Sequence, residues 1–153
     1  MLRIPILLFA LLLMTSAHGS DRLIGPIEAR LIKVADGDSL IVMARIWPGH
    51  DVRAHVRIDG IDTPELRGKC ALERQAAIVA RQTLAGLIGR EKLHLRQVRK
   101  GKYFGRVIAQ VATASGTRLA AGMLESGFAR PYRGGKRKPW CDELLLTGQV
   151  GRD

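Results

Sequence analysis

The sequence predicts an α+β fold that is mainly β: a five-stranded barrel with a helix between strands 3 and 4 and short C-terminal helices. With 153 residues, of which 46% are hydrophobic, the chain can bury one compact core. Five short runs rich in apolar residues are separated by turn-forming residues, and one longer run has helical spacing. This order is too short for a sandwich and lacks the regular strand-helix alternation of a parallel sheet.

The first three strands are predicted at residues 30–34, 40–46 and 52–58. The first two form a hairpin, because Asp36-Gly37-Asp38 between them is a common turn sequence. In the third, apolar and polar residues alternate strictly, so that Arg57 points away from the apolar face of its own strand.

A helix interrupts the strands. Apolar residues recur at spacings of three and four from Leu72 to Leu87, and Gly89 can end the helix in a left-handed cap. The remaining elements are two strands, a short helix and a brief final helix, predicted at residues 92–98, 106–113, 118–126 and 142–150. The order β-β-β-α-β-β-α favours an OB-type barrel (OB-fold).

Residues 1–19 have the composition of a secretory signal peptide. Arg3 precedes an apolar run from Ile4 to Met14, and small or polar residues follow it. The run is too short to span a bilayer comfortably, so a membrane anchor is the weaker alternative. We therefore expect one domain at residues 20–153, secreted or periplasmic, with no membrane anchor after signal cleavage and monomeric.

The chain is strongly basic, with a formal net charge of +11. Arg3 is the one Lys or Arg of the expected signal peptide, which has no Asp or Glu, so the charge belongs to the folded part. Such a charge attracts polyanions and speeds their encounter at low salt. Nucleic acid, anionic lipid and acidic polysaccharide all remain open as partners on this ground.

Cys70 and Cys141 are the two cysteines of the sequence. Export would place them where disulfides persist, so we expect them to pair. The alternative is two separate buried thiols. Neither has a His or a second Cys at metal-ligand spacing, which argues against a zinc site.

Charged groups gather where strands of the expected barrel end. The three constellations are Asp36-Gly37-Asp38-Ser39, Arg57 with Asp62-Thr63-Pro64-Glu65, and Tyr103-Phe104-Gly105-Arg106. Each alone has an ordinary structural explanation as a turn, a helix start or a strand start. Together they could bind a hard cation such as calcium or magnesium, grip a phosphodiester and activate a water.

In order and approximate spacing, these segments resemble the three signature segments of the staphylococcal nuclease (thermonuclease) family, over residues 29–132. The resemblance implies a calcium site formed by the carboxylates of Asp38 and Asp62 and the main-chain carbonyl of Thr63, with Asp36 in the outer shell. It also implies three catalytic residues. Arg57 and Arg106 would hold the reacting phosphate, and Glu65 would act on the attacking water.

The same resemblance implies that DNA and RNA are the substrates, cut to fragments with a 3′-phosphate and with little sequence preference. Lys102, Tyr103 and Tyr132 are then candidate substrate contacts. The chain departs from the family pattern at Phe104, which lacks a hydroxyl, and at Pro131, which changes the backbone before Tyr132.

Two other functions remain open from the sequence. One is a catalytically silent OB-fold module that binds nucleic acid, although such a module has little use for Glu65. The other is a cationic exported protein that adheres to anionic polymers through the basic loop at residues 133–138. His55 and His94 are expected at the surface, and Trp47 and Trp140 in packing roles.

Overall fold

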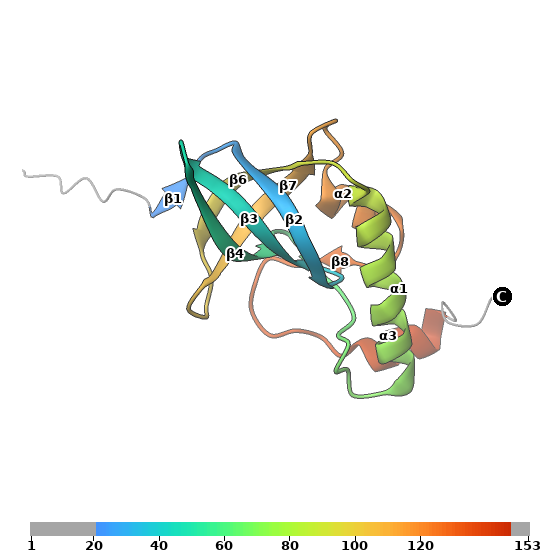
Figure 1. Cartoon of the computed structure of the whole chain (residues 1–153). Helices are drawn as coiled ribbons and strands as arrows, with labels where there is room; N and C mark the ends of the chain where they lie inside the picture. The colour runs from blue at the N-terminus through green and yellow to red at the C-terminus, as the bar shows by residue number, and fades with distance from the viewer. Residues whose placement is uncertain (1–20, 148–153) are drawn as a thin grey trace, which may run out of the picture.

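The computed structural model describes residues 21–147, so the expected signal peptide lies outside the described residues. Figure 1 shows a twisted barrel with helices gathered on one side of it. The strands are β1 (Arg22–Leu23), β2 (Ile27–Asp36), β3 (Ser39–Trp47), β4 (His50–Ile58), β5 (Ile61–Asp62), β6 (Leu93–Lys100), β7 (Arg106–Thr113) and β8 (Arg130–Pro131). The helices are α1 (Ala71–Ile88), α2 (Leu119–Glu125) and α3 (Trp140–Thr147).

Five strands close the barrel in the order β6-β2-β3-β4-β7, because β7 also pairs with β6. The β4–β7 pairing is parallel and the others in the barrel are antiparallel. Helix α1 lies between the third and fourth barrel strands in the sequence, so the predicted mainly β, OB-type fold is confirmed. Strands β1, β5 and β8 were not predicted, since two residues are too few to show a pattern.

The barrel core contains the apolar side chains of alternate strand positions. Leu40 and Val42 of β3 and Val56 and Ile58 of β4 are almost fully buried. Because successive side chains in a strand point to opposite faces, Arg57 lies on the outer face between the last two. The core is closed at one side by apolar residues of α1 and α2, namely Ala80, Leu84, Ile88, Leu119 and Met123.

Helix α1 packs a small buried residue, Ala80, against the hairpin between β2 and β3. At the turn of that hairpin, a Cβ on Gly37 would lie 2.8 Å from the Ala80 Cβ and 2.8 Å from the Thr63 Oγ1. Glycine is therefore required for the close approach of the turn to the helix. At the other end, the helix ends at Gly89 as predicted, and the Gly89 N–H donates to the Ala85 carbonyl. The predicted left-handed cap is not formed, because Gly89 combines φ 58° with ψ −125°.

Helix α3 packs against the start of α1 and begins two residues before the predicted helix. Trp140 and Leu144 are buried against Ala76. Next to them, Cys70 and Cys141 form a disulfide, as expected. Trp140 thus has the expected packing role, whereas the expectation for Trp47 is wrong, because its side chain is 69% exposed at the end of β3. None of the helices in residues 21–147 is long and apolar enough to cross a membrane.

One ion pair ties the end of β4 to β6 on the outside of the barrel. Both Nη atoms of Arg99 donate to the carboxylate of Asp59, each at 2.8 Å. These hydrogen bonds are the main reason why the pKa of Asp59 lies below its ordinary value. The pair is partly exposed, so its contribution to stability is modest.

We expect Asp59→Asn to lower the free energy of unfolding by about 1 kcal/mol near neutral pH. A carboxylate whose pKa is lowered by folding contributes its full stabilisation above the ordinary aspartate pKa of about 4. This contribution disappears as the pH falls through the lowered, folded-state pKa. Urea unfolding of both proteins over a range of pH measures the difference, which should shrink in acid; a difference that stays constant would contradict the assignment.

The disulfide joins residues that are 71 positions apart, so it restricts the unfolded chain strongly. In the chain-entropy model, replacing both Cys70 and Cys141 by Ser should cost roughly 4 kcal/mol of unfolding free energy. Denaturant titration with and without a reducing agent measures the loss. The reductant should destabilise the wild type and leave the double variant unchanged, and equal stability of the two proteins would show that the bridge contributes nothing.

Candidate active site

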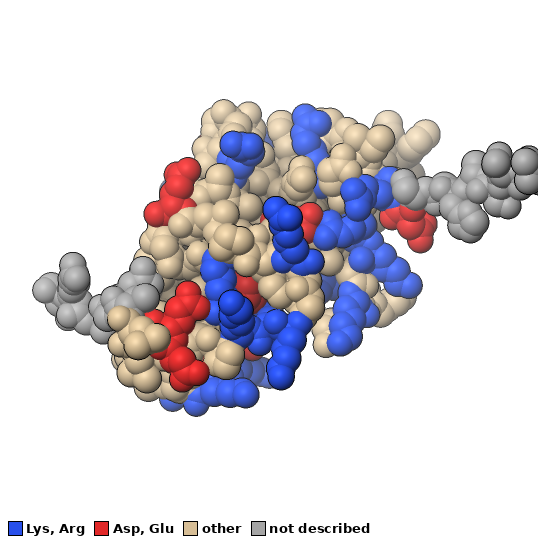
Figure 2. All heavy atoms as spheres, turned by 180° about the vertical axis from the view of Figure 1, so that it is seen from behind, with Lys and Arg blue, Asp and Glu red and all other residues tan. Residues whose placement is uncertain are grey.

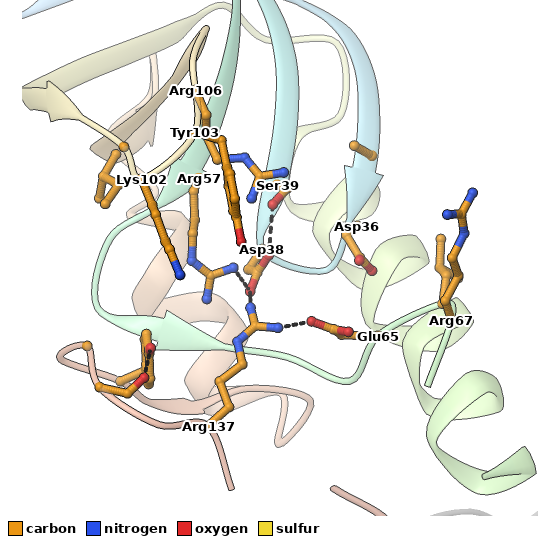
Figure 3. A pocket seen from close by; sticks show the side chains of 17 residues that line it. Asp36, Asp38, Ser39, Arg57, Glu65, Arg67, Lys102, Tyr103, Arg106 and Arg137 are labelled. Carbon is orange, nitrogen blue, oxygen red and sulfur yellow. Dashed lines mark hydrogen bonds and ion pairs between the residues drawn. The ribbon is translucent and has the colours of Figure 1, made fainter. Parts of the chain in front are cut away.

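An open cavity of about 970 Å³ lies beside the turn between β2 and β3. Its lining is strongly charged, as Figure 3 shows. Eight of the lining residues carry charged side chains, and two tyrosines join them: Asp36, Asp38, Arg57, Glu65, Arg67, Lys102, Arg106, Arg137, Tyr103 and Tyr132. On the molecular surface, Lys and Arg side chains crowd one face, with acidic side chains visible between them (Figure 2). The cavity lining therefore combines five basic side chains with three carboxylates, of which Asp38 is buried.

The hairpin turn supplies two of these carboxylates. Asp38 is 3% exposed and accepts a hydrogen bond of 2.9 Å from the Ser39 hydroxyl. Its main-chain carbonyl accepts from the N–H of Ile58 at 2.8 Å, which fixes the turn to the end of β4. Asp36 accepts from the N–H of Gly37, but burial dominates and raises the pKa of its carboxyl above the ordinary value.

Asp62 is the most enclosed carboxylate of the site, with no exposed surface. Its Oδ2 accepts hydrogen bonds from Arg130 Nη2 at 2.9 Å and from Trp140 Nε1 at 3.1 Å. Its Oδ1 accepts none from the described residues, although Arg137 Nε lies 2.9 Å away at an unfavourable angle. Thr63, the next residue, is also buried. A buried oxygen without a hydrogen bond is costly, and it is a position that a cation could satisfy.

Arg57 connects the two aspartates. Its Nη1 donates to Asp38 Oδ2 at 2.6 Å. Its Nη2 donates to the Ile61 carbonyl at 3.2 Å and also lies 3.6 Å from Asp62 Oδ1. The strand register explains this placement, since Ser39 pairs with Arg57 across β3 and β4. The guanidinium carbon also lies 5.7 Å from the ring centre of Tyr132, so the expected substrate-binding tyrosine borders the same arginine.

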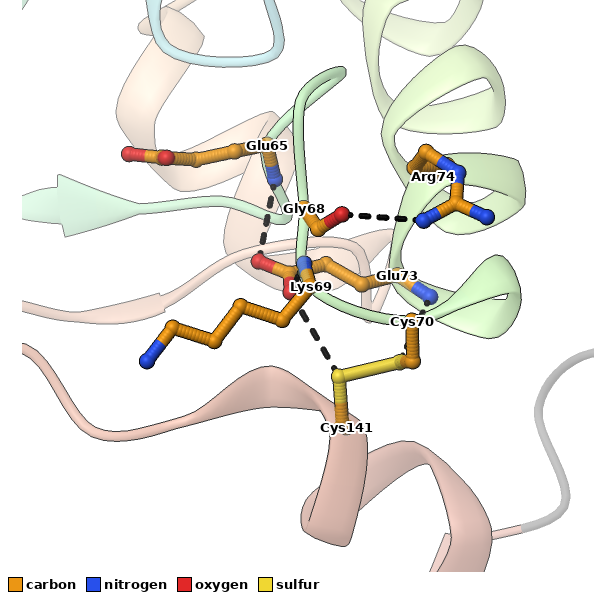
Figure 4. Close-up of a disulfide and its surroundings, with 7 residues drawn as sticks. All are labelled: Glu65, Gly68, Lys69, Cys70, Glu73, Arg74 and Cys141. Carbon is orange, nitrogen blue, oxygen red and sulfur yellow. Dashed lines mark hydrogen bonds between the residues drawn. A yellow bond between two sulfur atoms is a disulfide. The ribbon is translucent and has the colours of Figure 1, made fainter.

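Glu65 projects into the cavity from the segment that leads to α1 and forms an ion pair with Arg137. The backbone N–H of Glu65 donates a hydrogen bond to the side chain of Glu73, a residue that is 8% exposed. The Glu73 carboxylate accepts from the N–H groups of Lys69 at 3.0 Å and of Glu65 at 3.4 Å (Figure 4). The disulfide sulfur of Cys141 lies 3.5 Å from the same carboxylate, so the bridge borders this support.

The third constellation lies on the opposite wall of the cavity. Arg106 begins β7, and its guanidinium carbon lies 5.5 Å from the ring centre of Tyr103. Lys102 Nζ lies 5.6 Å from the same ring. Tyr103 is 59% exposed, while Phe104 points fully into solvent. Two cations and one accessible aromatic ring thus lie together, an arrangement suited to a phosphate and a neighbouring base.

His55 differs from its expectation as a surface residue. It is only partly exposed, and its Nε2 is buried without a hydrogen-bond partner among the described residues. Burial is the largest cause of its lowered pKa, and the positive charges of Arg106 and Arg53 act in the same direction. His55 is opposite Arg106 in the pairing of β4 with β7, so the imidazole belongs to the strand beside that arginine.

The structure places Asp38, Arg57, Glu65 and Arg106 around one cavity, and the buried Asp62 lies 3.6 Å from Arg57 Nη2. Thr63 is buried next to Asp62 and does not line the cavity. Three further residues of the site were missed by sequence reasoning: Glu73, Arg130 and Arg137. Arg137 belongs to the basic loop at residues 133–138, and its side chain lines the cavity. Its sequence context gives no signal, because no local pattern shows which cavity a glycine-containing loop will reach.

One further cluster has metal-ligating atom types. Cys70, Glu73 and Cys141 have such atoms within 4.8 Å of one another. The two sulfurs are bonded to each other, so neither is the thiolate that a metal requires. The oxygen donors of Asp38, Asp62 and Thr63 are better suited to a hard cation, since calcium prefers carboxylate and carbonyl oxygens.

Comparison with known proteins agrees with this geometry. The family model described as staphylococcal nuclease homologue matches residues 55–147, more than half of the chain. No curated protein matches the chain. The matched range contains Arg57, Asp62, Glu65 and Arg106, whereas the turn with Asp38 lies outside it, on the other side of β3. The chain therefore belongs to the family of staphylococcal nuclease homologues.

Proposed function

We propose that the protein is an exported, calcium-dependent endonuclease that hydrolyses phosphodiester bonds of DNA and RNA and leaves 3′-phosphate ends. Its family indicates a nuclease-like or nucleic-acid-binding function. The observation that carries the finer proposal is the meeting of Asp38, Arg57, Glu65 and Arg106 around one open, cationic cavity. Export is supported by the signal-like residues 1–19 and by the disulfide.

The carboxylates of Asp38 and Asp62, with the carbonyl of Thr63, would hold the calcium ion. The buried Asp62 Oδ1, which accepts no hydrogen bond from the described residues, fits this assignment. When bound, the ion would supply positive charge that stabilises the extra negative charge on the reacting phosphate.

The side chains of the cavity then divide the chemistry. Arg57 is fixed by Asp38 and by the Ile61 carbonyl, so its guanidinium can hold the phosphate without reorganisation. Arg106, stacked on Tyr103, would bind the same phosphate nearer the leaving 5′-oxygen. Glu65 would accept a proton from water as the water oxygen bonds to phosphorus and the bond from phosphorus to the 5′-oxygen breaks. The leaving 5′-oxygen would take a proton from solvent and depart as a hydroxyl.

The alternative is a silent binding module, and one observation favours it. Arg137 pairs with Glu65 in the structure, which would prevent that carboxylate from acting on water. The two functions are separated by incubating residues 20–153 with single-stranded and double-stranded DNA and with RNA, first with calcium and then with excess EDTA. A calcium-dependent nuclease cuts the substrate when calcium is present and leaves it intact in EDTA. Its products have 3′ ends that accept a new nucleotide only after a phosphatase has removed the 3′-phosphate. Intact substrate in both conditions would support the binding module.

The arginine roles predict large losses of rate. Arg57→Ala and Arg106→Ala should each lower kcat by about 10²- to 10³-fold, because each removes a preorganised donor to the transition state. Arg53→Ala is the matched control, since Arg53 is exposed on the same strand as Arg57 and lies outside the lining of the cavity. Single-turnover cleavage of a short oligonucleotide measures the effect. A variant that keeps nearly normal turnover would remove its arginine from the mechanism.

The cation assignment predicts a different defect for Asp38→Asn. The calcium concentration for half-maximal cleavage should rise by at least about tenfold. Removing a residue that only hydrogen-bonds to a metal ligand already weakens metal binding by about that factor, and losing a ligand should cost at least as much. Asp51→Asn is the control, because Asp51 pairs with Arg45 at the far ends of β3 and β4. Calcium titrations of cleavage measure both variants, and an unchanged calcium requirement for Asp38→Asn would rule out this carboxylate as a ligand.

A further inference from the structure

The loop between β8 and α3 places a guanidinium in the middle of the carboxylates assigned to cation binding and catalysis. Arg137 Nε lies 2.9 Å from Asp62 Oδ1, its Nη2 lies 3.7 Å from Asp38 Oδ2, and its Nη1 forms an ion pair with Glu65. Figure 3 shows this side chain entering the cavity from the loop and pointing toward Asp38 and Glu65. A single positive group thus faces three separate negative groups.

The other two arginines of the cluster cannot easily leave. Arg57 is on a barrel strand, has a side chain 14% exposed and donates to the Ile61 carbonyl. Arg130 has a side chain 16% exposed, stacks 4.1 Å from the ring centre of Trp140 and donates to the Lys138 carbonyl. Both therefore have anchors other than the carboxylates.

Arg137 has no such anchor among the described residues. Its side chain is 36% exposed, and its ion-pair partners are the three carboxylates. The loop before it contains Gly134 and Gly135, with φ of 99° and 91°, so the backbone there has conformational freedom that other residues lack. The guanidinium can move out of the cavity without breaking a buried contact elsewhere in the described fold.

A divalent cation and the guanidinium would compete for the same oxygens. Asp62 Oδ1 is within ion-pair distance of Arg137 but accepts no hydrogen bond from it, so the arginine balances the charge without satisfying the oxygen fully. A hard cation coordinates such oxygens directly. The guanidinium is thus a weak occupant that a small ion of higher charge can replace.

We propose that Arg137 is an internal counter-ion, which holds Asp38, Asp62 and Glu65 until a divalent cation displaces it. This inference rests on the cation site of the proposed function. The exchange also releases Glu65 from its ion pair, so that the carboxylate assigned to the attacking water becomes available only when the cation arrives. Arg137 therefore lowers the affinity for the cation and links its binding to the readiness of Glu65.

Calorimetric titration of calcium into residues 20–153, without nucleic acid, tests the exchange. Arg137→Ala should bind calcium about tenfold more tightly than the wild type, within the usual range of coupling energies between sites. Arg137→Gln, which keeps most of the side-chain length, should behave in the same way. Lys136→Ala is the matched control, because it removes one positive charge from the same loop, from a residue that is not in the cavity lining.

Thermal unfolding in EDTA and in calcium gives a second readout. Without its counter-ion, Arg137→Ala should melt at a lower temperature than the wild type in EDTA and gain more from calcium. Calcium affinity that is unchanged or weaker in both Arg137 variants would overturn the exchange while the proposed nuclease function stands. No calcium binding by any of the proteins, the wild type included, would overturn the cation site itself.

Discussion

The rest of the site depends on the ion pairs of the Asp62 carboxylate with three arginines. The carboxylate is fully buried, and a buried charge is tolerated only when opposite charges and hydrogen bonds compensate it. Arg57 comes to it from β4, Arg130 from β8 and Arg137 from the loop before α3. Segments far apart in the sequence are thereby held against one end of the barrel. Trp140 of α3 also joins this cluster, because its Nε1 donates a hydrogen bond to Asp62.

Around this charge, barrel geometry brings the reactive groups together. The register of β3 with β4 sets Arg57 beside the Asp38 turn, and the close contact at Gly37 presses that turn against α1. The parallel pairing of β4 with β7 brings Arg106 to the same cavity. The cavity can therefore present cations to a polyanion while Asp38 and Asp62 stay buried. This combination agrees with a family whose members act on or bind nucleic acid.

Sequence patterns predicted those parts of the structure that local physics controls. The strict alternation of apolar and polar residues in β4 predicted that Arg57 points out of the barrel. The positions of Gly37 and Gly89 predicted the hairpin turn and the end of α1. Features that depend on long-range packing left no such trace. Glu73 lies in the first turn of a helix and reads as a surface residue, and its role becomes visible only when the segment with Glu65 folds over it. Arg137 looked like part of a solvated basic loop for the same reason.

The residues around the cavity are spread along the chain from Ala35 to Arg137, so no single element of the fold contains them all. The barrel must close through the pairing of β7 with β4, and the C-terminal segment must then dock, before the carboxylates and arginines face one another. An unfolded chain carries every reactive side chain but no assembled centre. Any activity of the cavity on nucleic acid therefore depends on the completed tertiary structure of the domain.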